Sequence, residues 1–214
     1  MKTRAAVVYK VNEPVVVEEI ELDPPKSGEV LVKMGASGVC HSDLSVIDGT
    51  IPMGLPAILG HEGAGTIQEV GPGVKSVKPG DSVMLTFVTP CGHCAYCTVG
   101  KPNLCTTHWE TTPKGVLFDG TSRFHKNGQT FYQFTRTGTM AEHTVCSANA
   151  VISVPKDTPL DKAALIGCGV TTGVGAVVNT AKVEAGSSVA VIGAGGVGIN
   201  VVQGSALVGA GKII

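Results

Sequence analysis

Four cysteines in one short stretch constrain this chain more than any other feature of its sequence. Cys91, Cys94, Cys97 and Cys105 form the pattern C-x2-C-x2-C-x7-C. The two-residue spacings allow the sulfurs to converge on one ion, and four thiolates complete a tetrahedral zinc shell with no position left for a substrate. A pair of disulfides is the alternative, but the N-terminal region contains no signal-peptide core to indicate secretion. The pattern therefore predicts a structural zinc lobe over residues 91–105.

Composition argues against two classes of partner. The chain has 214 residues and a formal net charge of -1. Nucleic acids and anionic membranes select concentrated basic surfaces, so we expect neither as the main partner. The uncharged run 189–211 is long enough to cross a bilayer, but its glycines and polar residues favour a strand, a turn and a helix. Clustered cysteines without a secretion signal predict a reducing, cytoplasmic location.

The first half of the sequence is rich in β-branched residues that alternate with polar ones. Gly- and Pro-rich turns separate these runs, which predicts antiparallel strands in a barrel-like module. The expected strands cover residues 5–9, 15–20, 29–34, 64–70 and 81–88, and strand character returns over 140–155. The polar residues 106–140 predict a long excursion without regular structure, with His108 facing an entrance or a partner.

The last part of the sequence changes character. Residues 160–182 have helical spacing that breaks near Gly167–Gly169. A buried-type strand over 187–192 then leads into Gly193-x-Gly195-x-x-Gly198 and a helix that runs to about Val208. Such glycines allow a tight turn and a close backbone approach to a pyrophosphate at the helix N-terminus. Tight packing between strand and helix is the alternative.

The acidic residue that would bind a ribose hydroxyl of the cofactor is expected about 20 residues beyond the glycine motif. That position falls after Ile214, so the sequence does not separate NAD from NADP. We therefore expect a first domain over 1–155 and, over 156–214, the first and incomplete part of a dinucleotide-binding domain.

Three further residues are candidates for a second metal site with an open position. Cys40 follows a strand, His61 lies between glycines, and Cys168 lies in Gly167-Cys168-Gly169. Catalytic zinc has three protein ligands and one free position. Each residue also has a structural explanation, as a small buried thiol or a hydrogen-bonded core histidine. Spacing alone leaves both interpretations open.

Several motifs in this order resemble one family. They are Gly60-His61-Glu62-Gly63-Ala64-Gly65, Val70-Gly71, Pro79-Gly80-Asp81, the four-cysteine lobe, Gly167-Cys168-Gly169, and Gly193-Ala194-Gly195-Gly196-Val197-Gly198. With them, the chain resembles the N-terminal portion of a zinc-dependent alcohol dehydrogenase of the medium-chain dehydrogenase/reductase superfamily. Residues 119–124 further resemble its longer branch, which includes liver-type enzymes and thiol-adduct formaldehyde dehydrogenases. The resemblance implies an α+β chain: a β-rich GroES-like barrel, then the start of a Rossmann α/β nucleotide-binding domain.

The resemblance also implies roles for individual residues. Cys40, His61 and Cys168 would bind a catalytic zinc, and Cys91, Cys94, Cys97 and Cys105 a structural one. Glu62 would stand behind the catalytic metal, Asp43 would orient His61, Ser42 would relay the alcohol proton, and Phe87 would line the substrate pocket. The residues implied to bind the cofactor are His41, Thr172, Gly193, Gly195, Gly196, Val197 and Gly198. Ser45 departs from the family pattern, because many relatives carry a second relay histidine there.

The implied reaction is hydride transfer between an alcohol, or a hydroxymethyl-thiol adduct, and NAD(P), giving an aldehyde or ketone. NAD is the expected cofactor, NADP is not excluded, and the partner is a small-molecule alcohol or aldehyde. The full-length protein is expected to be a homodimer or homotetramer, and this portion alone inactive. A truncated, non-catalytic zinc-binding GroES-like module is the competing hypothesis.

Overall fold

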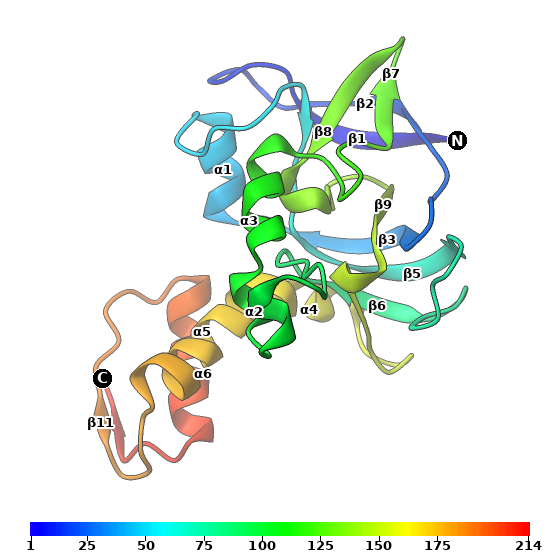
Figure 1. The fold of residues 1–214 in the computed structure, drawn as a ribbon. Coiled ribbons are helices and arrows are strands. Elements are labelled where there is room, and N and C mark those ends of the chain that lie inside the picture. The colour runs from blue at the N-terminus through cyan, green and yellow to red at the C-terminus, as the bar shows by residue number, and fades with distance from the viewer. The chain divides into compact units, whose positions relative to one another are not determined.

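The computed structural model describes residues 1–214, and its internal contacts divide the chain into two units (Figure 1). The first unit is Met1–Ala164 and the second is Leu165–Ile214. The boundary between the two units therefore falls after Ala164. The domain boundary expected after Pro155 remains a prediction.

A small closed barrel forms one half of the first unit. Its strand order is β1-β2-β7-β8-β4, closed by the β1–β4 pair. The strands are β1 (Lys2–Val8), β2 (Val16–Leu22), β4 (Ala57–Ile58), β7 (Phe124–Lys126) and β8 (Gln129–Gln133). Alternate side chains point inward along each strand, so Val7, Ile20 and Phe124 share one buried core.

A five-stranded antiparallel sheet forms the other half of the first unit. Its order is β10-β6-β5-β3-β9, and Figure 1 shows β3, β5 and β6 side by side. The strands are β3 (Glu29–Gly38), β5 (Glu62–Val70), β6 (Ser82–Leu85), β9 (His143–Ser147) and β10 (Val151–Ser153). Leu31 and Val145 of this sheet pack into the barrel core, which joins the two halves. The predicted β-rich barrel is confirmed.

Short helices occupy the connections of the first unit. They are α1 (His41–Ile47), α2 (Ala95–Thr98), α3 (Thr106–Thr111) and the 3-10 turns Pro102–Leu104, Thr112–Lys114, Phe134–Arg136 and Ala148–Ala150. The expected long excursion over residues 106–140 is wrong, because α3, β7 and β8 lie within it. The segment is mostly polar, so its alternation of buried and exposed residues was not recognised. Phe124, Phe131 and Gln133 are the buried members of this alternation.

The helical segment after β10 is continuous. It runs through α4 (Leu160–Leu165), a π-helical turn (Ile166–Val170), α5 (Thr171–Gly175) and a second π-helical turn (Ala176–Ala181). The predicted break near Gly167–Gly169 is therefore wrong, since the chain accommodates these glycines with a wider turn. By length and hydropathy alone, the 22 residues Leu160–Ala181 could cross a membrane, with a mean hydropathy of 1.4. One such helix is weak evidence, because core helices of soluble proteins pass the same test.

The second unit contains a strand–helix–strand motif. Strands β11 (Ser188–Val189) and β12 (Lys212–Ile213) pair in parallel, and α6 (Gly196–Leu207) connects them. This is the connection that a parallel α/β sheet requires. It confirms the predicted strand, turn and helix over residues 189–211. Helices α5 and α6 pack closely, because a Cβ on Gly173 would lie 2.5 Å from the carbonyl oxygen of Val197.

Candidate metal centres and nucleotide-binding segment

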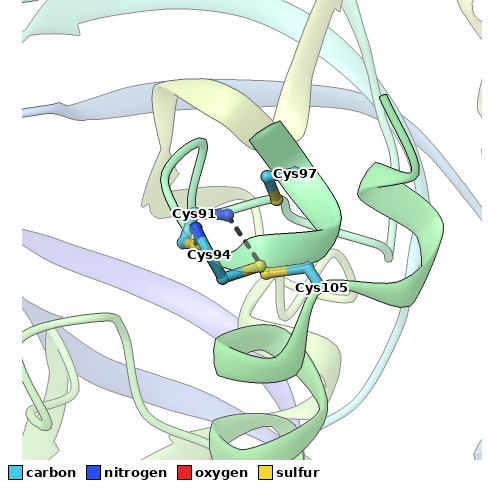
Figure 2. A group of neighbouring side chains, drawn as sticks. All are labelled: Cys91, Cys94, Cys97 and Cys105. Carbon is cyan, nitrogen blue, oxygen red and sulfur yellow. Dashed lines mark hydrogen bonds between the residues drawn. The ribbon is translucent and has the colours of Figure 1, made fainter. Parts of the chain in front are cut away.

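The four cysteines of the predicted zinc lobe converge in the structure. Their sulfur atoms all lie within 4.8 Å of one another. Figure 2 shows the four side chains gathered in one small region. Cys94 and Cys105 are the N-cap residues of α2 and α3, and Cys97 lies within α2. No disulfide joins any of them. A compact set of four thiols is a donor set that zinc prefers, so the residues fit the ion implied by the resemblance.

Backbone N–H groups surround these sulfurs. The Sγ of Cys105 accepts from the N–H of Cys91 at 3.3 Å and of His108 at 3.4 Å, and the Sγ of Cys91 accepts from Cys94 at 3.3 Å. The backbone N–H of Cys97 lowers the pKa of Cys94 to about 5. Burial instead raises the pKa of Cys97 to about 11. Donors of this kind favour thiolates, the form in which cysteine binds metal.

A second group of side chains that could hold a metal ion lies at the end of the five-stranded sheet. The ligand atoms of Cys40, His61 and Glu62 lie within 4.8 Å of one another. Strand register brings them together, because Gly38 at the end of β3 pairs with Glu62 at the start of β5. Cys40 lies two residues after Gly38, and His61 lies one residue before Glu62. The antiparallel pair therefore places both ligands at one edge of the sheet.

The carboxylate of Asp43 connects the two segments that carry these ligands. One oxygen accepts from the backbone N–H of Cys40 and the other from that of Gly60, each at 2.9 Å. The second oxygen also lies 3.6 Å from Nδ1 of His61. Asp43 is 2% exposed, so these interactions are protected from water. This geometry supports the expectation that Asp43 orients His61, and it adds a backbone role that the sequence did not indicate.

Backbone conformation and close packing both require a glycine at position 60. Its φ of +92° is in the left-handed region, and a Cβ there would lie 2.6 Å from the backbone nitrogen of Met140. Its carbonyl oxygen accepts from the N–H of Thr139 at 3.0 Å. The backbone immediately before His61 is thus held from both sides.

Two phenylalanines flank the His61 ring edge to face. Phe87, predicted in the substrate pocket, has its ring centroid 5.8 Å from that of His61. Phe134 lies closer, at 5.2 Å, and the sequence analysis missed it. It lies in the segment expected to be irregular, so no local signal pointed to it. Both rings restrict the orientation of the imidazole.

The other predicted residues of the first unit lie on α1. His41 is its first residue and is exposed. The hydroxyl of Ser42 lies 3.7 Å from the Cys40 sulfur. Ser45 is buried on the same helix, with its carbonyl oxygen accepting from the N–H of Ile51 at 2.8 Å.

In the second unit, Cys168 lies in the π-helical turn Ile166–Val170 and Thr172 in α5. The glycines of the Gly193–Gly198 motif have different surroundings. Gly193 has φ of +95°, and a Cβ on Gly198 would collide with the Gly193 carbonyl oxygen. Gly195 and Gly196 face open space, because a Cβ on either residue would have no atom within 4 Å. The 12-residue helix α6 begins at Gly196, directly after Gly195, so its free N–H groups lie beside this open segment.

His108 is the clearest correction among the candidate residues. The sequence analysis expected it to face an entrance or a partner, but its side chain is 0% exposed. Its Nδ1 accepts from the backbone N–H of Thr89 at 3.2 Å and from the Arg136 guanidinium at 2.6 Å. The sequence analysis missed Arg136, because an arginine between threonines in a polar segment gives no sign of burial.

Comparison with known proteins identifies the family. Residues 26–156 match the family model described as "Alcohol dehydrogenase GroES-like domain". The chain belongs to this family. Among curated relatives it is 50% identical over 214 residues to the S-(hydroxymethyl)glutathione dehydrogenase of Photobacterium damsela subsp. piscicida. It is equally identical, over 216 residues, to the enzyme of that name from Paracoccus denitrificans. These matches cover the whole chain and 58% of each relative, so this GroES-like chain spans little more than half their length.

Solved structures give the same assignment. An alcohol dehydrogenase zinc-binding domain protein from Burkholderia ambifaria matches with a TM-score of 0.95 and 39% identity, over 100% of this chain and 58% of that one. Benzyl alcohol dehydrogenase from Acinetobacter calcoaceticus matches with a TM-score of 0.92 and 33% identity, over 100% and 57%. The chain therefore has the fold of these proteins over a little more than half of their length, in agreement with the family that the motifs predicted.

Proposed function

We propose that the protein carrying this GroES-like chain is a zinc-dependent oxidoreductase. It transfers hydride between an alcohol and NAD(P), giving an aldehyde or ketone, or between a hydroxymethyl adduct of a thiol and NAD(P), giving an S-formyl thioester. The observation that carries this proposal is the cluster of Cys40, His61 and Glu62 at the end of the β3–β5 pair. Thiolate and imidazole ligands with a carboxylate beside them suit catalytic zinc better than a structural site.

In this proposal, Cys40, His61 and Cys168 hold the catalytic zinc, with Glu62 behind it. The four-cysteine lobe holds a structural zinc. The catalytic ion would supply Lewis-acid polarisation of a hydroxyl or carbonyl oxygen, and the nicotinamide would accept or donate the hydride. Asp43 keeps His61 and the Cys40 backbone in place, so the ligands need no rearrangement. Phe87 and Phe134 keep the imidazole in a fixed orientation and cover it with apolar surface.

A proton must leave as an alcohol is oxidised. Ser42 is proposed to accept it, because its hydroxyl lies beside the Cys40 sulfur and no histidine occupies position 45. From Ser42 the proton would pass to cofactor hydroxyls or water.

The cofactor is proposed to bind at the N-terminus of α6. Gly193, Gly195, Gly196, Val197 and Gly198 would let the pyrophosphate approach the helix N–H groups, with His41 as a further contact and Thr172 and Val197 against the nicotinamide. The open space beside Gly195 and Gly196 supports this, because side chains there would occupy it. NAD is favoured, and NADP remains possible.

The substrate proposed is a hydroxymethyl adduct of a low-molecular-weight thiol. Its support is the 50% identity to two S-(hydroxymethyl)glutathione dehydrogenases. Benzylic and primary alcohols are the competing substrates, given the likeness to benzyl alcohol dehydrogenase. A homodimer or homotetramer in the cytoplasm, without nucleic acid or membrane partners, completes the proposal.

The test uses the full-length protein and follows NADH formation and zinc content together. Formaldehyde with and without glutathione is compared with benzyl alcohol and ethanol. We expect turnover that needs the thiol and about two zinc ions per chain. Cys40→Ala and Cys168→Ala should each remove one zinc and all turnover. Cys146→Ala is the matched control, because Cys146 is buried on β9 outside both clusters and should retain zinc and activity. Full turnover in Cys40→Ala would refute the Cys40–His61 cluster as the catalytic site, and a parent protein that binds zinc but turns over none of these substrates would support the non-catalytic zinc-binding module.

A further inference from the structure

Arg136 is a buried cation without a carboxylate partner. Its side chain is 2% exposed, yet none of the ion pairs in the structure includes it. Arg123, the other buried arginine, is 1% exposed and pairs with Glu29 and Asp119. An unpaired charge is expensive to bury, so Arg136 requires another source of compensation.

The direct contacts of Arg136 are all uncharged. Its Nη2 donates to Nδ1 of His108 at 2.6 Å and to the Thr89 carbonyl at 3.1 Å, and its Nη1 donates to the Thr111 hydroxyl at 2.8 Å. Its Cζ lies 4.1 Å from the ring centre of Phe118. His108 accepts two hydrogen bonds through Nδ1, so the imidazole is neutral. These groups orient the guanidinium but do not offset its charge.

Hydrogen bonds connect Arg136, through His108, to a sulfur of the four-cysteine lobe. His108 lies one turn into α3 from Cys105, and its backbone N–H donates to the Cys105 sulfur at 3.4 Å. Burial lowers the pKa of Arg136 to about 10, while negative charge on Cys105 and Cys91 acts in the opposite direction. Thiolates in the lobe are thus a source of negative charge that acts on this arginine.

The backbone at Arg136 is held in an unusual conformation. Thr135 and Arg136 have φ of 49° and 65°, in the left-handed region that non-glycine residues avoid. Conformations of this kind persist where the surrounding structure imposes them, often at functional positions. Here the strained backbone directs the guanidinium inward toward α3.

We propose that Arg136 is the counter-charge of the four-cysteine zinc site and slows the loss of its metal. The proposal rests on zinc binding by these four cysteines. Zinc with four thiolates carries a net charge of about -2, and one buried guanidinium offsets part of it. Arg136 acts through His108 and the charge on the sulfurs, so it is a positioning residue for the metal lobe.

The test measures zinc release from the zinc-loaded full-length protein to a chromogenic chelator. All variants carry Cys40→Ser, which removes a ligand of the other site so that the measured ion belongs to the four-cysteine lobe. Arg136→Gln should release zinc roughly 10- to 100-fold faster, the usual effect of losing a partner that supports metal ligands. Arg136→Lys keeps the charge and should release zinc more slowly than Arg136→Gln. Arg123→Gln is the control, because the Arg123 guanidinium pairs with Glu29 and Asp119 and has no hydrogen bond to His108, and should release zinc at the parent rate.

A charge-balance rescue separates this role from simple packing. Cys97→His turns the lobe into a three-cysteine, one-histidine site with one negative charge fewer, which zinc also accepts. In the Arg136→Gln background this change should slow zinc release again, or restore folded protein if Arg136→Gln alone does not fold. Parent-rate release from Arg136→Gln, or no rescue by Cys97→His, would overturn the proposal. A parent without zinc in this lobe would instead refute metal binding by the four cysteines.

Discussion

Replacing Asp43 by Asn tests how the Cys40–His61 cluster is held. The aspartate uses both oxygens, one for the N–H of Cys40 and one for the N–H of Gly60. An asparagine has a single oxygen, so one backbone N–H must face an amide NH2 group instead. The substitution keeps the shape of the side chain and removes its charge.

The expected cost follows from these two contacts. Losing one hydrogen bond to a buried charged group, with its donor left unsatisfied, costs about 3 kcal/mol. For a chain of this size that lowers the melting temperature by roughly 6–12 °C. Zinc affinity at the cluster should also fall roughly 10- to 100-fold, because Asp43 supports the His61 ligand.

Thermal unfolding by circular dichroism and zinc competition with a chelator measure the two effects. Asp48→Asn is the matched control on the same chain segment, since that exposed carboxylate accepts only from Thr50. It should change neither quantity appreciably. An Asp43→Asn protein with unchanged melting temperature and zinc affinity would refute the reasoning about both contacts.

Three further predictions concern stability. Arg123→Met leaves Glu29 buried without its partner and should cost about 3–5 kcal/mol in urea unfolding, and Glu29→Gln added to it should recover part of the loss. Gly60→Ala should destabilise the protein by more than about 2 kcal/mol, because backbone strain at positive φ adds to the clash with Met140. Gly80 has φ of +87° and open space around it, so Gly80→Ala should cost only about 1 kcal/mol. Equal losses in the two variants would contradict the clash. Burial lowers the pKa of His143 below its ordinary value of 6.5, so the unfolded chain takes up this proton first. Stability should therefore fall as the pH decreases from about 7 to about 5, and His143→Gln should reduce that dependence; an unchanged pH profile would exclude the residue.

The sequence predicted the features that local patterns encode. Alternation of β-branched residues placed β1, β2, β3 and β5, because half-buried strands require it. The spacing of the four cysteines predicted that their sulfurs converge, because two-residue steps allow the sulfurs to face one point. The glycine motif likewise lies between a strand and a helix, as expected.

Other features depend on contacts between distant residues and left no local signal. The meeting of Cys40 and His61 follows from the register of β3 and β5, which only tertiary structure sets. The hairpin β7–β8 is short and mostly polar, and its burial comes from closing the barrel. The burial of Arg136 depends on α3 and Phe118, far from it in sequence.

Strand pairing at Gly38 and Glu62 has a consequence for how the two candidate centres acquire metal. Cys40 and His61 extend from neighbours in a hydrogen-bonded sheet, so an incoming ion finds them already adjacent. The four-cysteine lobe has only short helices and turns between its ligands, and there capture of the ion must fix the loop. Amide exchange within residues 91–105 should therefore slow markedly when zinc is added, while exchange along β3 and β5 barely changes.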